Sequence, residues 1–282
     1  MTALEPLDRL IERVPDGALV ALAPEYSWVP MAAVRALIRR GVKNLHLLTV
    51  PISGLAADLL IGAGCVGTLE SAGVTLGEAG QAPRFCDAVE TGLIRMRDST
   101  CPAIHTALQA AEKGVPFMPL AGLVGSDLVA NRDDWKVIDD PLERGGGPIV
   151  LLPAIRPDVA MFHSPRADRH GNVWIGRRRE LMTMAHAAKT TLITAETVED
   201  VDFLADEATA AGTLSSLYVT AIAEAKDGAR PMGLTGCYER DLDHIRAYAK
   251  EAATREGFER YLAREVFGEA ATRTGTRARA AS

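Results

Sequence analysis

Three glutamates stand beside segments that the sequence predicts to be strand ends, where a nucleophilic or general-base carboxylate would lie. These residues are Glu25, Glu70 and Glu78. A carboxylate in such a position can attack an acyl carbon or accept a proton. Nothing in the local sequence singles out one of the three, and acidic side chains are also common in solvated surface loops. The sequence therefore leaves open whether any of them has a catalytic role.

Glycine-rich segments accompany these carboxylates. Residues 70–73 read Glu-Ser-Ala-Gly and run on into a second glycine-rich segment at 77–80, and residues 122–127 read Gly-Leu-Val-Gly-Ser-Asp. Glycine lets the backbone come close to a ligand, and exposed backbone amides can hold an anionic or carbonyl oxygen. Loops at the carboxyl ends of strands form the usual ligand crevice of an open α/β sheet. A simple turn also explains each segment when it is taken alone.

Other motifs argue against several classes of site. Residues 62–67 match the Gly-x-Gly-x-x-Gly pattern of dinucleotide binding, but that pattern must follow a strand and open a helix. Here a predicted helix precedes the glycines and a predicted strand follows them, so a helix end and a tight turn are the better interpretation. The sequence contains no P-loop motif and no Gly-x-Ser-x-Gly motif, and its histidines and cysteines show no metal-binding spacing. We therefore expect no metal and no bound cofactor.

One short basic run could contact an anion. Arg177, Arg178 and Arg179 follow one another, which fits either a solvated helix start or a contact with a phosphate or an acidic partner surface.

The chain as a whole is acidic, with 282 residues and a formal net charge of −6. Nonspecific nucleic-acid binding needs a large basic face, so no nucleic-acid partner is expected. The first residues lack the apolar run of a secretory signal, and no apolar stretch reaches membrane-spanning length. The expectation is a cytoplasmic protein without membrane contact.

The elements that must position these residues alternate between strands and helices. Strands are expected at residues 18–22, 45–50, 66–69, 93–96 and 115–118, and helices at 31–38, 56–63, 83–90 and 103–113. This alternation predicts right-handed crossovers and a mainly parallel sheet that helices cover on both faces.

After residue 118 the pattern changes. Extended segments are expected at residues 135–138, 149–152 and 159–163, and their crowding suggests antiparallel pairing. A helix at 180–188, strands at 191–195 and 218–223, and helices at 241–253 and 258–267 complete the prediction. From about residue 269 the sequence consists mainly of Ala, Arg, Thr and Gly without periodicity. We therefore expect one domain, residues 1–268, and a disordered tail, residues 269–282.

In their order and spacing, these loops resemble the A subunits of family I coenzyme A transferases of the glutaconate type. The resemblance covers roughly residues 10–265, and no single phrase carries it alone. The phrases that carry it are residues 77–80, 82–85, 114–119, 125–127, 167–173, 187–189, 194–196, 228–231 and 236–238.

The resemblance implies an open, mainly parallel α/β sheet flanked by helices, the CoA-transferase-like (NagB/RpiA-type) fold. It also implies an enzyme that moves CoA between an acyl-CoA and a carboxylic acid, with the CoA thioester as substrate. In this family a glutamate of the B subunit attacks the acyl-CoA, giving an acyl-glutamyl anhydride and then a glutamyl-CoA thioester. This chain lacks the Glu-Asn-Gly phrase in which that glutamate lies. A B-type partner subunit is therefore expected to supply the catalytic glutamate, in a heterodimer or a heterotetramer.

The same resemblance suggests where this chain would touch substrate. CoA would lie mostly on the partner, and the acyl group would face this chain. The residues expected to contact substrate are Tyr26, Ser27, Glu70, Glu78, Gly122, Gly125 and Ser126.

Two departures keep alternatives open. Residues 23–28 read Ala-Pro-Glu-Tyr-Ser-Trp where many A subunits have a Gly-Gly-Phe-like turn, which should change the shape of the acyl pocket. The chain also resembles CoA-dependent ring-opening hydrolases, whose A subunit has a catalytic glutamate in an Asp-Glu-Gly-like phrase. Residues 98–101 at that place read Asp-Ser-Thr-Cys. A non-catalytic ligand-binding or scaffold protein of the same fold is a third alternative.

Overall fold

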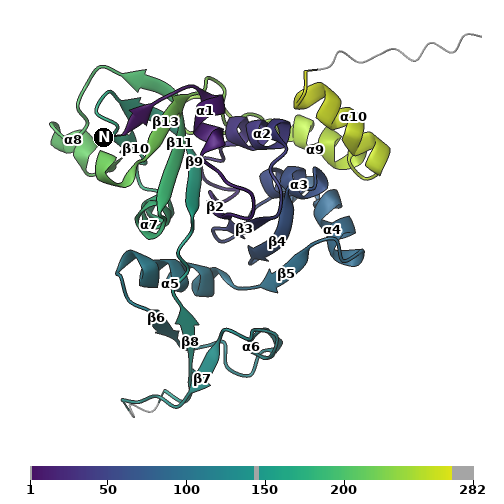
Figure 1. The fold of residues 1–282 in the computed structure, drawn as a ribbon, viewed down its shortest axis with the longest axis vertical. Helices are drawn as coiled ribbons and strands as arrows, with labels where there is room; N and C mark the ends of the chain where they lie inside the picture. Colours follow the sequence, from purple (N-terminus) through teal and green to yellow (C-terminus); the bar gives the residue numbers. More distant parts are fainter. Residues whose placement is uncertain (1, 143–145, 269–282) are drawn as a thin grey trace, which may run out of the picture.

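A twisted central sheet organises the protein (Figure 1), whose computed structural model describes residues 2–142 and 146–268. In spatial order its main strands are β1 (Ala3–Leu4), β13 (Ala221–Glu224), β11 (Thr190–Glu199), β9 (Val159–Asp168), β2 (Leu19–Leu22), β3 (Leu45–Thr49), β4 (Val66–Ser71) and β5 (Arg95–Asp98). Each neighbouring pair along this path is parallel. The open, mainly parallel sheet expected from the sequence is confirmed.

Helices cover both faces of the sheet, because successive strand residues point to opposite sides and both sides are apolar. In β2, Val20 and Leu22 join the core on one face, while Ala21 joins the core on the other. The helices on the first face are α1 (Leu7–Glu12), α2 (Met31–Arg40), α3 (Leu55–Gly62), α4 (Pro83–Glu90), α9 (Leu242–Glu251) and α10 (Arg255–Glu265). The helices on the second face are α5 (Cys101–Glu112) and α7 (Arg179–Ala187).

Glycines end two of these helices where the sequence predicts. Helix α2 stops at Gly41, whose φ of 76° is the left-handed conformation that glycine adopts without strain. Helix α3 ends at Gly62, and Gly64, with a φ of 69°, turns the chain into β4. The glycine pattern at residues 62–67 therefore joins a helix to a strand, the reverse of a dinucleotide-binding loop.

The direction in which the chain adds strands reverses beside β2. From β2 the chain builds outward through β3, β4 and β5, and it then returns to place β9 on the other side of β2 before building outward through β11 and β13. Backbone hydrogen bonds join the two halves at this point: the Ala23 amide donates to the Met161 carbonyl (3.1 Å), and the His163 amide donates to the Trp28 carbonyl (2.8 Å). Loops at such a switch diverge and leave a crevice for ligands.

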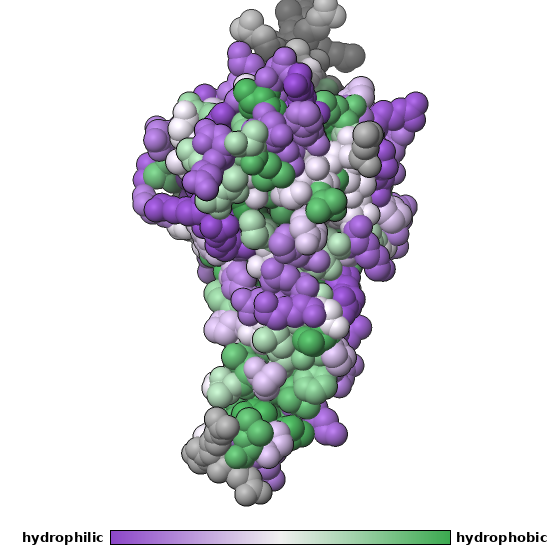
Figure 2. Space-filling model, turned by 90° about the vertical axis from the view of Figure 1, so that its left-hand side faces the viewer, coloured by the Kyte–Doolittle hydropathy of each residue, from purple (hydrophilic) through white to green (hydrophobic). Residues whose placement is uncertain are grey.

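A small antiparallel sheet extends away from the main body below α5 (Figure 1). We call it the arm; it consists of β6 (Phe117–Leu120), α6 (Asp127–Ala130), β7 (Lys136–Ile138) and β8 (Ile149–Pro153). Val150 and Leu152 of the arm pack against Ala103 of α5. Figure 2 shows apolar surface gathered over this part of the molecule, where Phe117 and Leu142 are among the exposed apolar side chains.

The antiparallel pairing expected after residue 118 is confirmed for β7 and β8 but is wrong for residues 159–163. That segment begins β9, which pairs in parallel with both β2 and β11. Strand β9 is buried along nearly its whole length, so it occupies the centre of the main sheet and not an edge.

Several short elements were not predicted, because segments of two to six residues are too short to show a periodic pattern. Besides α1, β1 and α6, these are η1 (Gly77–Ala79), β10 (Val173–Trp174), α8 (Glu207–Ala210), β12 (Thr213–Leu214) and η2 (Ser216–Tyr218). The strand predicted at 218–223 begins only at Ala221, because η2 and its Ser215 cap occupy the preceding residues. The tail predicted at residues 269–282 lies outside the described residues. Within the described ranges, no helix is both long and apolar enough to cross a membrane.

A buried carboxyl group fixes α9 on α3 and α4. The Tyr248 hydroxyl donates to Asp58 Oδ2 (2.5 Å), and the Phe85 amide donates to Asp58 Oδ1 (2.6 Å). Asp58 is fully buried, and burial raises its pKa to about 6 although the bond from Tyr248 acts in the opposite direction. By holding α9, this contact also holds the segment that leads into α9.

We expect Asp58→Asn to remove a pH dependence of the free energy of unfolding. The folded protein keeps a proton that the unfolded chain loses near the ordinary pKa of 3.8, so this group makes stability fall as pH rises from about 4 to about 6. The difference between the two pKa values corresponds to about 3 kcal/mol. Urea denaturation of both proteins across this pH range measures it, and parallel stability curves would contradict the prediction.

Candidate active site

A cavity of about 300 Å³ lies at the carboxyl end of β2, beside the strand switch. Residues 25–28, which follow β2, form one wall, and residues 232–240, which precede α9, form another. Arg178, at the start of α7, completes the lining. Tyr26 is 60% exposed, so the cavity opens to the outside at this side chain.

The loop after β2 is held by its own turn and by neighbouring strands. Pro24 cannot donate a backbone hydrogen bond, and its carbonyl accepts from the Ser27 amide (2.9 Å) to close a turn. The Glu25 amide donates to the carbonyl of Ile52, in the loop after β3 (3.3 Å). The bulkier loop that replaces a Gly-Gly-Phe-like turn is therefore ordered, and it presents four residues in succession, 25–28, to the cavity.

Glu25 is the most perturbed carboxylate of this cavity. Its side chain is only 9% exposed, and Arg240 Nη2 donates to its Oε1 (2.9 Å). Its other oxygen, Oε2, is buried without a hydrogen-bond partner among the described residues. Burial raises the pKa of Glu25 to about 7, against the opposing effects of the Arg240 charge and the Gly54 amide. Near neutral pH this carboxyl group can therefore both hold and release a proton.

Glycine is required at position 54 for Glu25 to lie where it does. A Cβ atom added to Gly54 would lie 2.6 Å from the Glu25 carboxyl carbon and 2.4 Å from the Thr75 carbonyl oxygen. Backbone atoms cannot give way to such a contact, so the loop after β3 is shaped around the Glu25 side chain.

Tyr26 and Ser27, both expected from the sequence to contact substrate, lie together at this cavity. Ser27 is buried, and its hydroxyl donates to Glu180 Oε1 (2.5 Å). Burial and the negative charge of Glu180 raise the pKa of Tyr26, so its hydroxyl remains a hydrogen-bond donor at neutral pH. The Tyr26 hydroxyl can therefore donate to an oxygen of a ligand at the mouth of the cavity, while the Ser27 hydroxyl holds the loop to Glu180.

Three charged residues of this site were not among the predicted contacts: Arg178, Glu180 and Arg240. The arginine run at 177–179 was the available signal for Arg178, and it left a solvated helix start open. The structure separates the three arginines, since Arg177 is exposed while Arg178 lines the cavity. No local pattern marks Glu180 or Arg240, because both reach the site only through the fold.

A buried hydrogen-bond network supports the cavity wall that contains Tyr238. His163 Nδ1 lies 2.8 Å from Thr194 Oγ1, and its Nε2 lies 3.2 Å from Glu196 Oε2. The Tyr238 hydroxyl also donates to Glu196 Oε2 (3.1 Å). Burial lowers the pKa of His163 to about 4, so the ring is neutral at physiological pH. The network fixes Tyr238, and with it the cavity wall at residues 232–240.

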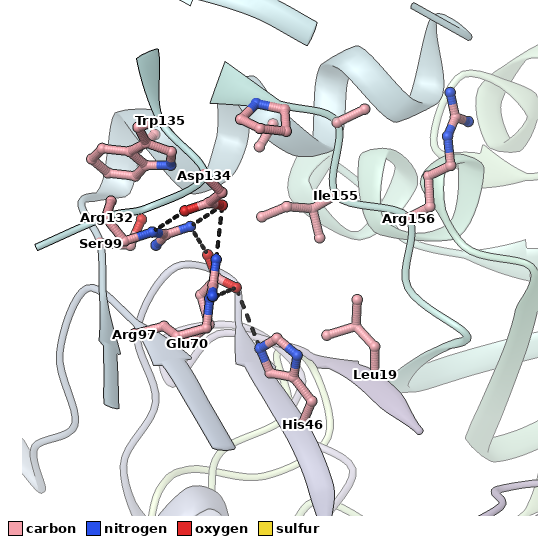
Figure 3. Close-up of a pocket in the computed structure, with 14 residues that line it drawn as sticks. Leu19, His46, Glu70, Arg97, Ser99, Arg132, Asp134, Trp135, Ile155 and Arg156 are labelled. Carbon is pink, nitrogen blue, oxygen red and sulfur yellow. Dashed lines mark hydrogen bonds and ion pairs between the residues drawn. The ribbon is translucent and has the colours of Figure 1, made fainter. Parts of the chain in front are cut away.

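Glu70 lies elsewhere, in a second cavity of about 180 Å³ between the main sheet and the arm (Figure 3). Arg132 Nη2 donates to Glu70 Oε1 (2.8 Å), and Arg97 and His46 approach its other oxygen. Burial would raise the pKa of Glu70, but the bond with His46 and the charges of Arg132 and Arg97 hold it below its ordinary value. Glu70 is therefore an ionised group that ties the arm to β4.

The other predicted contacts are also separate from Tyr26 and Ser27. Glu78 lies exposed in η1. Gly122 and Gly125, with φ of 105° and 83°, are exposed in the loop between β6 and α6 of the arm. The Ser126 hydroxyl donates to the Leu123 carbonyl in the same loop (2.7 Å). The chain by itself does not bring these four residues to the cavity, and their contact with substrate stays a prediction.

The chain is similar to known proteins over most of its length. A family model described as coenzyme A transferase matches residues 4–225. The A subunit of the 3-oxoadipate CoA-transferase of Pseudomonas knackmussii is 33% identical over 276 residues, with 95% of each chain covered. A subunit of the cholesterol ring-cleaving hydrolase of Rhodococcus jostii is 28% identical, with 85% of this chain and 83% of that subunit covered.

The fold agrees with that of a solved enzyme. The structure of the glutaconate coenzyme A-transferase of Acidaminococcus fermentans superposes with a TM-score of 0.85 and 26% sequence identity, over 95% of this chain and 89% of the other.

We expect Arg240→Gln to destabilise the protein more at pH 8.5 than at pH 5. Glu25 is mostly protonated at the lower pH and ionised at the higher, so the loss of its counter-charge matters only where the carboxylate exists. Breaking a largely buried pair should cost about 2 kcal/mol at pH 8.5. Thermal or urea denaturation measures the difference, with Arg246→Gln on the exposed side of α9 as the matched control. An equal loss at both pH values would contradict the assignment.

We expect Arg132→Met to loosen the arm while leaving the main sheet intact. The substitution leaves Glu70 buried with one counter-charge fewer, which should cost about 2–3 kcal/mol. Amide hydrogen exchange measured by mass spectrometry should show faster exchange in β6 and β8 than in the wild type, with β2 and β3 unchanged. Arg156→Met is the control, since Arg156 lines the same cavity but is exposed. Unchanged protection of the arm would refute the role given to Glu70.

Proposed function

This chain belongs to the coenzyme A transferase family, and from that premise we propose that it is the A subunit of a heteromeric CoA transferase whose catalytic glutamate lies on a partner subunit. The observation that carries the proposal is the cavity at the strand switch, which is walled by this chain on one side and open at Tyr26. A second subunit that closes this opening would place its own carboxylate opposite residues 25–28. The relatives named as A subunits support such a partner.

The proposed reaction conserves the energy of the thioester. The partner's glutamate attacks the thioester carbonyl, forms an acyl-glutamyl anhydride and releases CoA as thiolate. The thiolate attacks the glutamyl carbonyl of the anhydride, which gives glutamyl-CoA and frees the first acid. The acceptor carboxylate then repeats these steps in reverse order to leave as the new acyl-CoA. Each step replaces one activated acyl bond by another. Water would hydrolyse the anhydride or the thioester, so the site must exclude it.

This chain would bind and orient the acid during those steps. Tyr26 offers its hydroxyl group to the reacting carboxylate, the Ser27 hydroxyl ties the loop to Glu180, and buried Trp28 excludes water behind them. Glu25 lies too deep, and too firmly paired with Arg240, to act as a free nucleophile. Its carboxyl group instead sets the charge at the base of the cavity.

The arm and its surroundings offer surface for the partner. Val115, Phe117, Val124, Val137 and Leu142 are exposed there. An apolar patch of this kind is typical of a protein–protein contact. Whether the assembly is a heterodimer or a heterotetramer stays open, and the cytoplasmic location remains a prediction.

Ring-opening hydrolysis is less well supported. The hydrolase mechanism considered above needs a glutamate after β5, and residues 98–101 contain none. The Asp98 carbonyl accepts from Arg132 (3.1 Å), and the Thr100 side chain caps α5, so these residues serve the fold.

Reconstitution tests the proposal. The purified chain should be inactive alone, and the addition of its B-type subunit should give CoA exchange between an acyl-CoA and a free acid. Incubation with acyl-CoA should then leave a hydroxylamine-sensitive adduct on a glutamate of the partner, mapped by mass spectrometry. An adduct on this chain would overturn the proposal. Binding of the two subunits without any transfer or adduct would favour the scaffold alternative.

A further inference from the structure

Glu25 and Arg240 form an ion pair in the wall of the cavity at the strand switch, and the proposed reaction uses neither of them. Both residues line the cavity, and Arg240 Nη2 donates to Glu25 Oε1 (2.9 Å). Glu25 Oε2 and Arg240 Nε are both buried without a hydrogen-bond partner among the described residues. The pair therefore satisfies neither side chain completely.

The electrostatic surroundings leave Glu25 as a group whose charge can change near neutral pH. Burial raises the pKa of Glu25 to about 7, against the Arg240 charge and the Gly54 amide. Burial also raises the pKa values of Tyr26 and Tyr238, so both stay uncharged in this range. Arginine stays charged throughout. The other charged side chains that line or border this part of the cavity are Arg178, Glu180, Glu239 and Glu78.

An anion bound anywhere in this cavity would lie close to Glu25. The volume of about 300 Å³ is that of a sphere roughly 8 Å across, a distance at which two charges still interact appreciably inside a protein. A bound carboxylate disfavours the ionised form of Glu25 because the two charges are alike. Neutral Glu25 in turn leaves the positive charge of Arg240 to the ligand. The ligand and the proton therefore each favour the binding of the other.

We propose that the cavity takes up a substrate carboxylate together with a proton, which Glu25 receives from solvent while the charge of Arg240 passes to the ligand. The inference rests on the proposed function and adds how the acid is admitted. Glu25 stands in the loop that replaces a Gly-Gly-Phe-like turn, so the coupling depends on a residue that such a turn does not supply.

The pH dependence of acid binding tests the coupling, with butanoate as the probe because it stays ionised from pH 6 to pH 8.5. Isothermal titration into the complex of this chain with its B-type subunit should show an affinity that falls by up to about 10-fold per pH unit above pH 7, the slope of one coupled proton. Titration in buffers of different ionisation enthalpy should show proton uptake at pH 8. It should show almost none at pH 6, where Glu25 already holds its proton.

Three substitutions separate the roles of the lining residues. Glu25→Gln keeps the shape of the side chain and cannot ionise, so binding should lose its pH dependence and become tighter than in the wild type at pH 8. Arg240→Gln should weaken binding at pH 6 by about 10- to 100-fold, the range of a charged hydrogen bond. Glu239→Gln is the matched control, because it removes an exposed carboxylate of the same cavity and should keep the wild-type slope.

The outcomes separate this inference from the proposed function. An affinity that does not change with pH in the wild type, or an equal slope in Glu25→Gln, would overturn the inference. Absence of butanoate binding at pH 6 would do the same. The titration needs no acyl-CoA, so its result is independent of the reconstitution assay. CoA transfer without coupled proton uptake would refute the coupling alone, and coupled binding without any transfer would refute the proposed function alone.

Discussion

The hydrogen bonds between the loop after β2 and strand β9 are the interaction on which the rest of the molecule depends. The chain builds the sheet outward in two directions, and the halves meet where β2 pairs with β9 and, just beyond β2, where Ala23 and Trp28 bond to Met161 and His163. Parallel neighbours cannot be joined by a hairpin, so this contact must form between segments far apart in sequence. The loop between the two bonds is left without a strand to pair with, and it becomes the wall of the cavity.

Long-range pairing of buried polar and charged groups then fixes the elements around that wall. The loop after β2 is joined to the segment before α9 by Glu25 and Arg240. Helix α9 is joined to α3 by Tyr248 and Asp58. The arm is joined to β4 by Arg132 and Glu70. Burying either partner without the other would leave an unpaired polar or charged group with a large desolvation cost. Each pair therefore stabilises only the arrangement of elements that brings its two partners together.

The proposed roles of the two subunits, one forming the acid-binding cavity and the other supplying the nucleophile, follow from the same geometry. This chain offers a cavity lined by hydroxyl groups and paired charges that opens at an exposed tyrosine. Its most deeply placed carboxylate is committed to an arginine. A carboxylate nucleophile needs to be accessible and unpaired, and a surface brought by a second protein can provide one without disturbing the pairs that hold this fold.

The sequence by itself determined the family, the open parallel sheet and most of the longer elements. Alternating apolar runs, Gly41 and Gly62 at helix ends, and ordered glycine phrases are local signals, and each was readable without coordinates. Tyr26 and Ser27 follow the strand that the sequence predicted at residues 18–22, and their contact with substrate stays a prediction. Only the tertiary structure decided which of Glu25, Glu70 and Glu78 lies in the cavity and that β9 occupies the centre of the sheet. It alone brought Arg178 and Arg240 to one site, because those outcomes depend on burial and charge pairing between residues that no local pattern connects.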